Sequence, residues 1–259
     1  MLRLTALAAP IKRTATYSEQ LVQSGGPSTV SVGPLRMRTV ISSVIPPAAP
    51  GGVITVPFTY GSFRLLPTSV GSSAQLKAIR AYLATFGGLS GEFTVSTTGA
   101  VLSSSVAIPP SANATVRTLL QQLSNQSSQL SVPLPTQAVG IGARWRATTH
   151  LSAVGVELSQ TYEYTLVRHE GTRLTLEVGY TQTGARQPAA FPGLPAGVTA
   201  ELTGWNITGT GTTVLDLSQV IAVEGHLEAQ GREEFRFDQG AQSETLDQHV
   251  KFGFDVAPG

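Results

Sequence analysis

The stretch that decides the fold is VELSQTYEYTLVRHEGTRLTLEVGYTQT, residues 156–183. Apolar and polar side chains alternate along both of its halves, and this two-residue period is typical of a β-strand with one buried face. Residues 169–172, HEGT, separate the halves with a glycine, which favours a tight turn. The stretch therefore predicts an antiparallel β-hairpin of residues 156–168 and 174–183.

Strand patterns extend over most of the remaining chain. Turn-forming glycine and proline separate them, for example at Gly25-Gly26-Pro27, in the proline-rich loop 46–52 and at Gln230-Gly231. A break at Gly33-Pro34 is expected inside the strand region 29–45. The further strands are expected at residues 2–23, 29–45, 53–66, 91–97, 101–108, 143–151, 205–211, 214–229, 233–237 and 246–256.

Helical spacing of apolar residues occurs in two places only. A first helix is expected over residues 72–86, ended by Gly87-Gly88, and a second over residues 111–129, entered through Pro109-Pro110-Ser111. Both patterns leave one apolar stripe that needs a partner surface. The residues expected to face the sheet are Ile79, Leu83, Leu119 and Leu123.

These elements favour an α+β fold that is mainly antiparallel β. About ten sequential antiparallel strands tend to curl into a barrel-like sheet or half-barrel. The two amphipathic helices then pack on its concave face. We expect one β-rich domain over residues 1–259, with 1–132 and 133–259 as weakly related halves.

Composition excludes several classes of protein. The 259 residues carry a formal net charge of +1 and only 13% charged residues, so a nucleic-acid partner is not expected. There is no cysteine, which excludes disulfides, thiolate metal sites and a cysteine nucleophile. No apolar run reaches 18 residues, so no helix is expected to span a membrane.

The first ten residues, MLRLTALAAP, are interpreted as the start of a mature domain. Their apolar part is too short for a signal peptide and is interrupted by Arg3 and Thr5. A cysteine-free chain rich in serine and threonine fits the outside of a bacterial cell. We therefore expect an extracytoplasmic location, in the periplasm or at the cell surface, with the signal peptide absent from this sequence.

The connector PLPTQAVGIGARW, residues 133–145, resembles a PLP…VGxGARW segment of uncharacterised bacterial envelope proteins, both secreted proteins and lipoproteins. The order strands–helix–hairpin–helix–strands also resembles the LolA/LppX-type lipoprotein carriers. That resemblance implies a half-barrel closed by helices, with a cavity that holds acyl chains. The chain departs from the lipoprotein pattern because it lacks the lipobox cysteine.

The aromatic side chains allow two interpretations. They fill a core, or they line an apolar cavity. Two short helices are too few to cover a ten-stranded sheet, and this mismatch supports the hypothesis of an apolar cavity. Its walls would then come from the late strands and from the helices. The residues expected to contact a hydrophobic or lipid-like ligand are Tyr82, Phe86, Leu120, Tyr162, Tyr164, Phe252 and Phe254.

The sequence patterns give little support for a catalytic site or a metal site. The four histidines, His150, His169, His226 and His249, share no ligand spacing and each falls on a polar face or in a turn. The alternation of Arg232, Glu234 and Arg236 is typical of cross-strand ion pairing. No cofactor and no catalytic residue are assigned.

Three functions follow from these patterns. The favoured one is an extracytoplasmic carrier of a hydrophobic ligand. The first alternative is a structural or accessory subunit of a cell-envelope assembly, with an envelope protein as partner. The second is a copper-dependent redox enzyme built on the four histidines.

Overall fold

A computed structural model describes residues 2–4, 9–25, 28–46, 52–108, 131–153, 155–191 and 194–259. The described elements, in chain order, are β1(Ala9–Gly25), β2(Ser28–Ile45), β3(Val53–Tyr60), β4(Arg64–Leu65), α1(Ser73–Leu83), η1(Ala84–Phe86), β5(Ser90–Ser96), β6(Val101–Val106), β7(Arg144–Ala153), β8(Val156–Glu170), β9(Arg173–Gly184), β10(Gln187–Ala189), β11(Val198–Asp216), β12(Glu224–Gln239) and β13(Gln242–Pro258).

All described strands belong to one sheet, whose main path runs β6-β5-β3-β2-β1-β13-β12-β11-β9-β8-β7. β10 adds to β11 and β4 adds to β2. Every described pairing is antiparallel, and the first and last strands of the chain, β1 and β13, lie side by side at its centre. Among the described residues the two edges, β6 and β7, do not pair with each other, so the curved sheet stays open.

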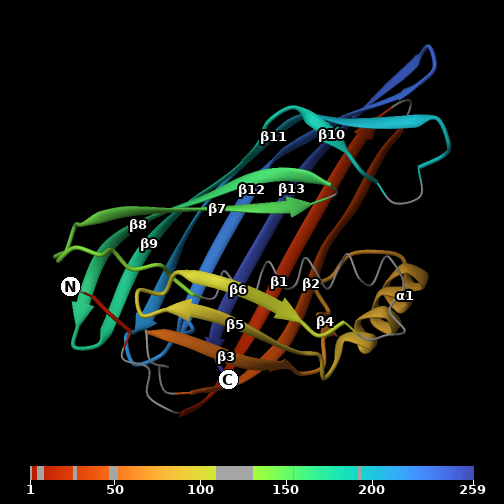
Figure 1. Ribbon diagram of the computed structural model, residues 1–259. Coiled ribbons are helices and arrows are strands. Elements are labelled where there is room, and N and C mark those ends of the chain that lie inside the picture. Colours follow the sequence, from red (N-terminus) through yellow and green to blue (C-terminus); the bar gives the residue numbers. More distant parts are fainter. Residues whose placement is uncertain are drawn as a thin grey trace.

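The sheet curls so that its two ends approach each other across the concave face (Figure 1). We call the β3, β5 and β6 end the N-wing and the β7, β8 and β9 end the C-wing. One hydrophobic core joins them, since it holds Phe58 and Phe93 of the N-wing together with Leu166 and Leu176 of the C-wing. The predicted α+β half-barrel, mainly antiparallel, is therefore confirmed.

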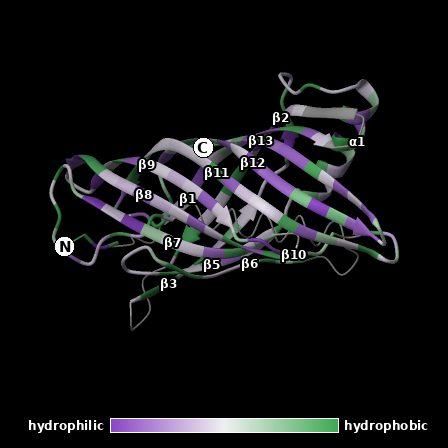
Figure 2. Ribbon diagram, turned by 90° about the horizontal axis from the view of Figure 1, so that it is seen from above, coloured by the Kyte–Doolittle hydropathy of each residue, from purple (hydrophilic) through white to green (hydrophobic). Residues whose placement is uncertain are grey.

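A second, smaller core lies at the other end of the long strands. It contains Val156, Leu158, Leu202 and Phe235, and Phe191 closes it with its ring 4.9 Å from the ring of Phe235. Figure 2 shows hydrophilic and hydrophobic residues alternating along the long strands, which gives each strand one face for these cores and one for solvent.

The first predicted helix is present as α1 followed by η1. Ser72 caps α1 in a reciprocal pair of hydrogen bonds with Gln75, because the hydroxyl accepts from one backbone N–H and the amide oxygen from the other. Leu83 is buried and Ile79 packs against the main core, as their stripe predicts. The second predicted helix, with Leu119, Leu120 and Leu123, lies outside the described residues.

The predicted boundaries between residues 205 and 237 are wrong. β11 and β12 are each continuous, and Gln230-Gly231 lies inside β12 instead of forming a turn. A Cβ at Gly231 would meet the Asn206 carbonyl oxygen at 2.1 Å. The glycine permits a close approach of two strands within the sheet, which a sequence cannot distinguish from a turn.

Candidate functional site: the concave face

Aromatic rings form a wall on the concave face of the C-wing. Trp145 stacks on Tyr164 with ring centroids 5.6 Å apart, and Tyr164 stacks on Tyr162 at 6.0 Å. The wall continues through Tyr180, 5.3 Å from Tyr162, to Phe252 at 5.8 Å. Strand register explains it, because Trp145 opposes Tyr164 and Tyr162 opposes Tyr180 on neighbouring strands.

A tyrosine pair joins this surface to the N-wing. Tyr17 of β1 packs on Phe254 with ring centroids 5.0 Å apart. Its hydroxyl also interacts with Tyr60 of β3, and burial raises the pKa of Tyr17 well above its usual value. Tyr17 therefore stays protonated, and its contact with Tyr60 links the N-wing to the centre of the sheet.

A small apolar cavity of about 60 Å³ lies next to the aromatic wall. Residues of β8, β9, β11, β12 and β13 line it, together with Val132 of the connector. The residues that line it include Val132, Tyr162, Tyr164, Val178, Leu227, Phe254 and Val256.

The connector that carries the PLP motif ties the two wings together. The Leu134 backbone N–H donates to the Thr98 carbonyl at 2.6 Å, in the β5–β6 turn of the N-wing. The Trp145 indole of the C-wing donates to the Pro133 carbonyl at 2.7 Å. Ser131 adds a bond from its hydroxyl to the Gly99 carbonyl. The motif thus links the two wings at one end of the space between them, which we call the trough.

A hydrogen-bonded polar network crosses the concave face beside the aromatic wall. The Trp205 indole donates to Gln182 Oε1 at 2.9 Å, and Gln182 Nε2 donates to Gln160 Oε1 at 3.3 Å. Gln160 also accepts from the Tyr180 hydroxyl and donates to the Tyr162 hydroxyl. The two glutamines are buried, and these bonds satisfy them without a charged group.

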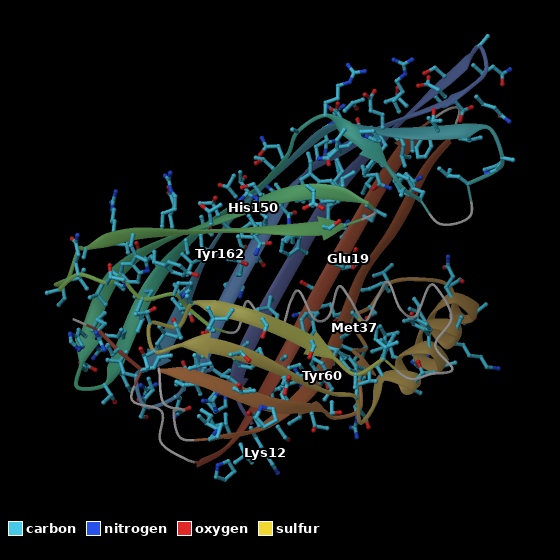
Figure 3. The ribbon with its side chains drawn as sticks, in the orientation of Figure 1. Lys12, Glu19, Met37, Tyr60, His150 and Tyr162 are labelled. Carbon is cyan, nitrogen blue, oxygen red and sulfur yellow. The ribbon has the colours of Figure 1, made fainter. Side chains whose placement is uncertain are left out.

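Two carboxylates, Glu19 of β1 and Glu233 of β12, point to the same concave face. Glu19 opposes Phe252 in the register, and Glu233 opposes Trp205 and Gln248. Burial, and to a smaller extent the negative charge of Glu19, raises the pKa of Glu233 to about 7. Burial also raises the pKa of Glu19. Figure 3 shows Glu19 and Tyr162 projecting toward the space that the N-wing covers.

Four of the seven residues predicted to contact a ligand lie on this one surface. Tyr162, Tyr164 and Phe254 line the cavity, and Phe252 lies next to Tyr180 in the aromatic wall. Tyr82 and Phe86 belong to a separate aromatic group, with ring centroids 4.9 Å apart. Phe63 packs between Phe86 and Tyr60 in the same group. Leu120 lies outside the described residues. Whether these side chains bind a ligand stays a prediction.

The four histidines lie apart on exposed positions of the outer face or at strand ends. His226 pairs with Asp255 at 2.6 Å, and His169 Nε2 lies 3.1 Å from the Gly171 carbonyl oxygen. Within the described ranges, which include all four, no three histidine, aspartate or glutamate side chains gather to hold a metal ion.

Sequence reasoning missed Glu19, Glu233, Gln160 and Gln182. Each occupies a position where the alternation of its strand calls for an inward side chain. A polar residue at such a position is the available signal. It is weak because polar residues also occupy the outward positions of the same strands.

Comparison with known proteins adds little about function. No family model matches the chain, and no curated protein matches it. Among solved structures it is similar to lipovitellin, from a study of lipid–protein interactions, with 12% identity and a TM-score of 0.42 over 98% of this chain. The chain spans about a quarter, 26%, of that protein. The toluene transporter TodX of P. putida gives 8% identity and a TM-score of 0.15 over 97% of this chain and 90% of that one.

No helix among the described residues has the length and apolar character needed to cross a membrane.

Proposed function

We propose that this chain is an extracytoplasmic bacterial protein that binds a hydrophobic, lipid-like molecule on the concave face between its two wings. One observation carries the proposal: aromatic and aliphatic side chains form an inward surface, with an apolar cavity among Tyr162, Tyr164 and Phe254. The resemblance of residues 133–145 to envelope proteins supports the location.

The physics of such a surface favours apolar ligands without strong headgroup selection. Removing apolar area from water contributes about 25 cal/mol per Å². The cavity itself has room for only a few methylene groups, so the rest of a chain would extend along the aromatic wall. After the cost of association, micromolar affinity for a long chain is the expected order.

Titration of delipidated protein with N-phenyl-1-naphthylamine, an uncharged apolar dye, tests this proposal. Saturable binding with enhanced fluorescence is expected. Val178→Trp places an indole in the cavity that Val178 lines and should weaken binding about tenfold, a loss of about 1.4 kcal/mol. Val167→Trp is the matched control, since Val167 is exposed on the outer face of β8.

Native mass spectrometry of gently purified protein supplies a second readout, in which a co-purified lipid appears as an added mass. Absence of saturable dye binding, or equal binding by the two variants, would refute the binding function. An envelope-assembly subunit would then be the better proposal.

A further inference from the structure

The concave face carries two carboxylates, Glu19 and Glu233, that have no cationic partner among the described residues. Neither Glu19 nor Glu233 makes a hydrogen bond or ion pair within the part of the chain that the structure describes. Their neighbours in the register are Leu35, Phe252, Trp205 and Gln248. Unlike the carboxylates of the outer face, they lie against an otherwise apolar and amide-bearing wall.

The other titratable groups of this face do not neutralise them. Arg13 of β1 is buried and its donors are used, by the carbonyls of Ala222 and Lys12, each at 2.9 Å, and by Gln219. Tyr17, Tyr162 and Tyr180 have pKa values raised by burial and stay uncharged near neutral pH.

Within the described ranges, the neighbouring strands and wings bring no further cation to the pair. The positions of β2, β11 and β13 that face Glu19 and Glu233 carry Leu35, Met37, Trp205, Ile207, Val250 and Phe252. The N-wing contributes apolar side chains and Tyr60 to the shared core. Arg36 and Arg38 of β2 alternate with Met37 and so belong to the opposite face.

We propose that Glu19 and Glu233 determine the ligand specificity of the concave face: they exclude molecules with a permanent negative charge and admit uncharged ones. This inference rests on the binding function proposed above and narrows it to one ligand class. Glu233 is half-buried and Glu19 is exposed. A carboxylate beside an apolar wall repels an anion more strongly than one in open water, because solvent screening is weaker there.

Two dyes with one ring system test the specificity. N-phenyl-1-naphthylamine is uncharged, and 1-anilinonaphthalene-8-sulfonate carries a sulfonate that stays ionised from pH 5.5 to 8.5. The double variant Glu19→Gln with Glu233→Gln should raise the affinity for the sulfonate dye about tenfold at pH 8.5. It should leave the affinity for the uncharged dye within about twofold, because the amides keep the shape of the wall.

The matched control is Glu157→Gln with Glu177→Gln. Both residues are exposed, at outward positions of β8 and β9 that alternate with buried Leu158 and Leu176, so the net charge changes equally without touching the concave face. This control should leave the ratio of the two affinities unchanged. Near-UV circular dichroism verifies that each variant keeps its packing.

The pH profile provides an independent readout. Lowering the pH from 8.5 to 5.5 protonates Glu233, whose pKa is about 7, and should raise the sulfonate-dye affinity of the unaltered protein. The Glu19/Glu233 variant should lose this dependence and the control variant should keep it. Both variants retain the four histidines, which lie at exposed positions, so the histidines do not distinguish the two variants.

The outcomes separate the two proposals. If the Glu19/Glu233 variant binds the sulfonate dye no more tightly than the unaltered protein and still binds the uncharged dye, the proposed exclusion of anions is wrong. The proposed binding function then remains. If the unaltered protein binds neither dye, the binding function fails and the specificity fails with it.

Discussion

The two faces of the sheet differ in whether their charged side chains are paired. On the outer face, charged side chains occur in cross-strand pairs, such as Arg232 with Asp247 and Arg146 with Glu163. On the concave face, Glu19 and Glu233 lie beside aromatic and aliphatic residues and have no cationic partner in the described part of the chain. Paired charges in solvent add little stability, whereas unpaired charges beside an apolar wall cost stability. The concave face therefore bears groups whose presence packing alone does not favour, which agrees with the binding surface proposed above.

The largest contrast between the faces is expected from truncating neighbouring residues of β8. Leu166 is fully buried in the main core, and Val167 is 37% exposed on the other side. Leu166→Ala should lower the free energy of unfolding by about 2–5 kcal/mol, because it leaves a cavity in a packed region. Val167→Ala should cost less than about 1 kcal/mol. Urea unfolding compares them, and equal losses would contradict the assignment of the two faces.

A pH-dependent effect is expected at Glu233. Its carboxyl has a pKa of about 7 in the folded protein, above the value of about 4.3 in an unfolded chain. The folded state therefore holds the proton more tightly, and stability falls as the pH rises from about 4.5 to 7. Glu233→Gln should add about 1–3 kcal/mol to the free energy of unfolding at pH 8 and nothing near pH 4. The stability difference caused by Glu177→Gln on the outer face should not follow this pattern. A gain from Glu233→Gln that is the same at pH 4 and at pH 8 would refute the desolvation of Glu233.

An intermediate loss of stability is expected from removing the hydrogen bond between Trp145 and the connector. Trp145→Phe keeps the stacking on Tyr164 but removes the indole donor to the Pro133 carbonyl. The loss should be about 1–2 kcal/mol, because the carbonyl loses its partner in a partly buried place. Calorimetric unfolding measures it. A change indistinguishable from that of Arg144→Lys, next to it on β7, would show that the connector does not hold the wings.

The smallest effect is expected from an outer-face ion pair. Arg146 and Glu163 form a salt bridge with side chains 67% and 59% exposed. Arg146→Ala should change the free energy of unfolding by less than about 1 kcal/mol, and 1 M salt should remove most of the difference. A loss comparable to that of Leu166→Ala would mean that the outer face also takes part in packing.

Local patterns were sufficient for the strands and for the first helix. The alternation in residues 156–183 requires a hairpin, since only a strand gives side chains a period of two, and Gly171 accepts the positive φ of 58° at its turn. Helical spacing between Leu76 and Phe86 predicted α1 and η1 for the same kind of reason. The inward aromatic residues Tyr162, Tyr164, Phe252 and Phe254 followed from the same parity.

Tertiary structure alone decided how far each strand runs and what the faces enclose. Whether a glycine such as Gly231 ends a strand or lets two strands approach depends on Asn206, 25 positions away in the chain. The closeness of Glu19 and Glu233 depends on β1 and β12 both pairing with β13, which joins the two ends of the chain. The amino-acid sequence by itself determined the local period and hence the elements, because a strand's alternation is a property of neighbouring residues. Non-local pairing determined the trough, its cavity and its two isolated carboxylates, because no short stretch of the chain contains both of the surfaces that enclose them.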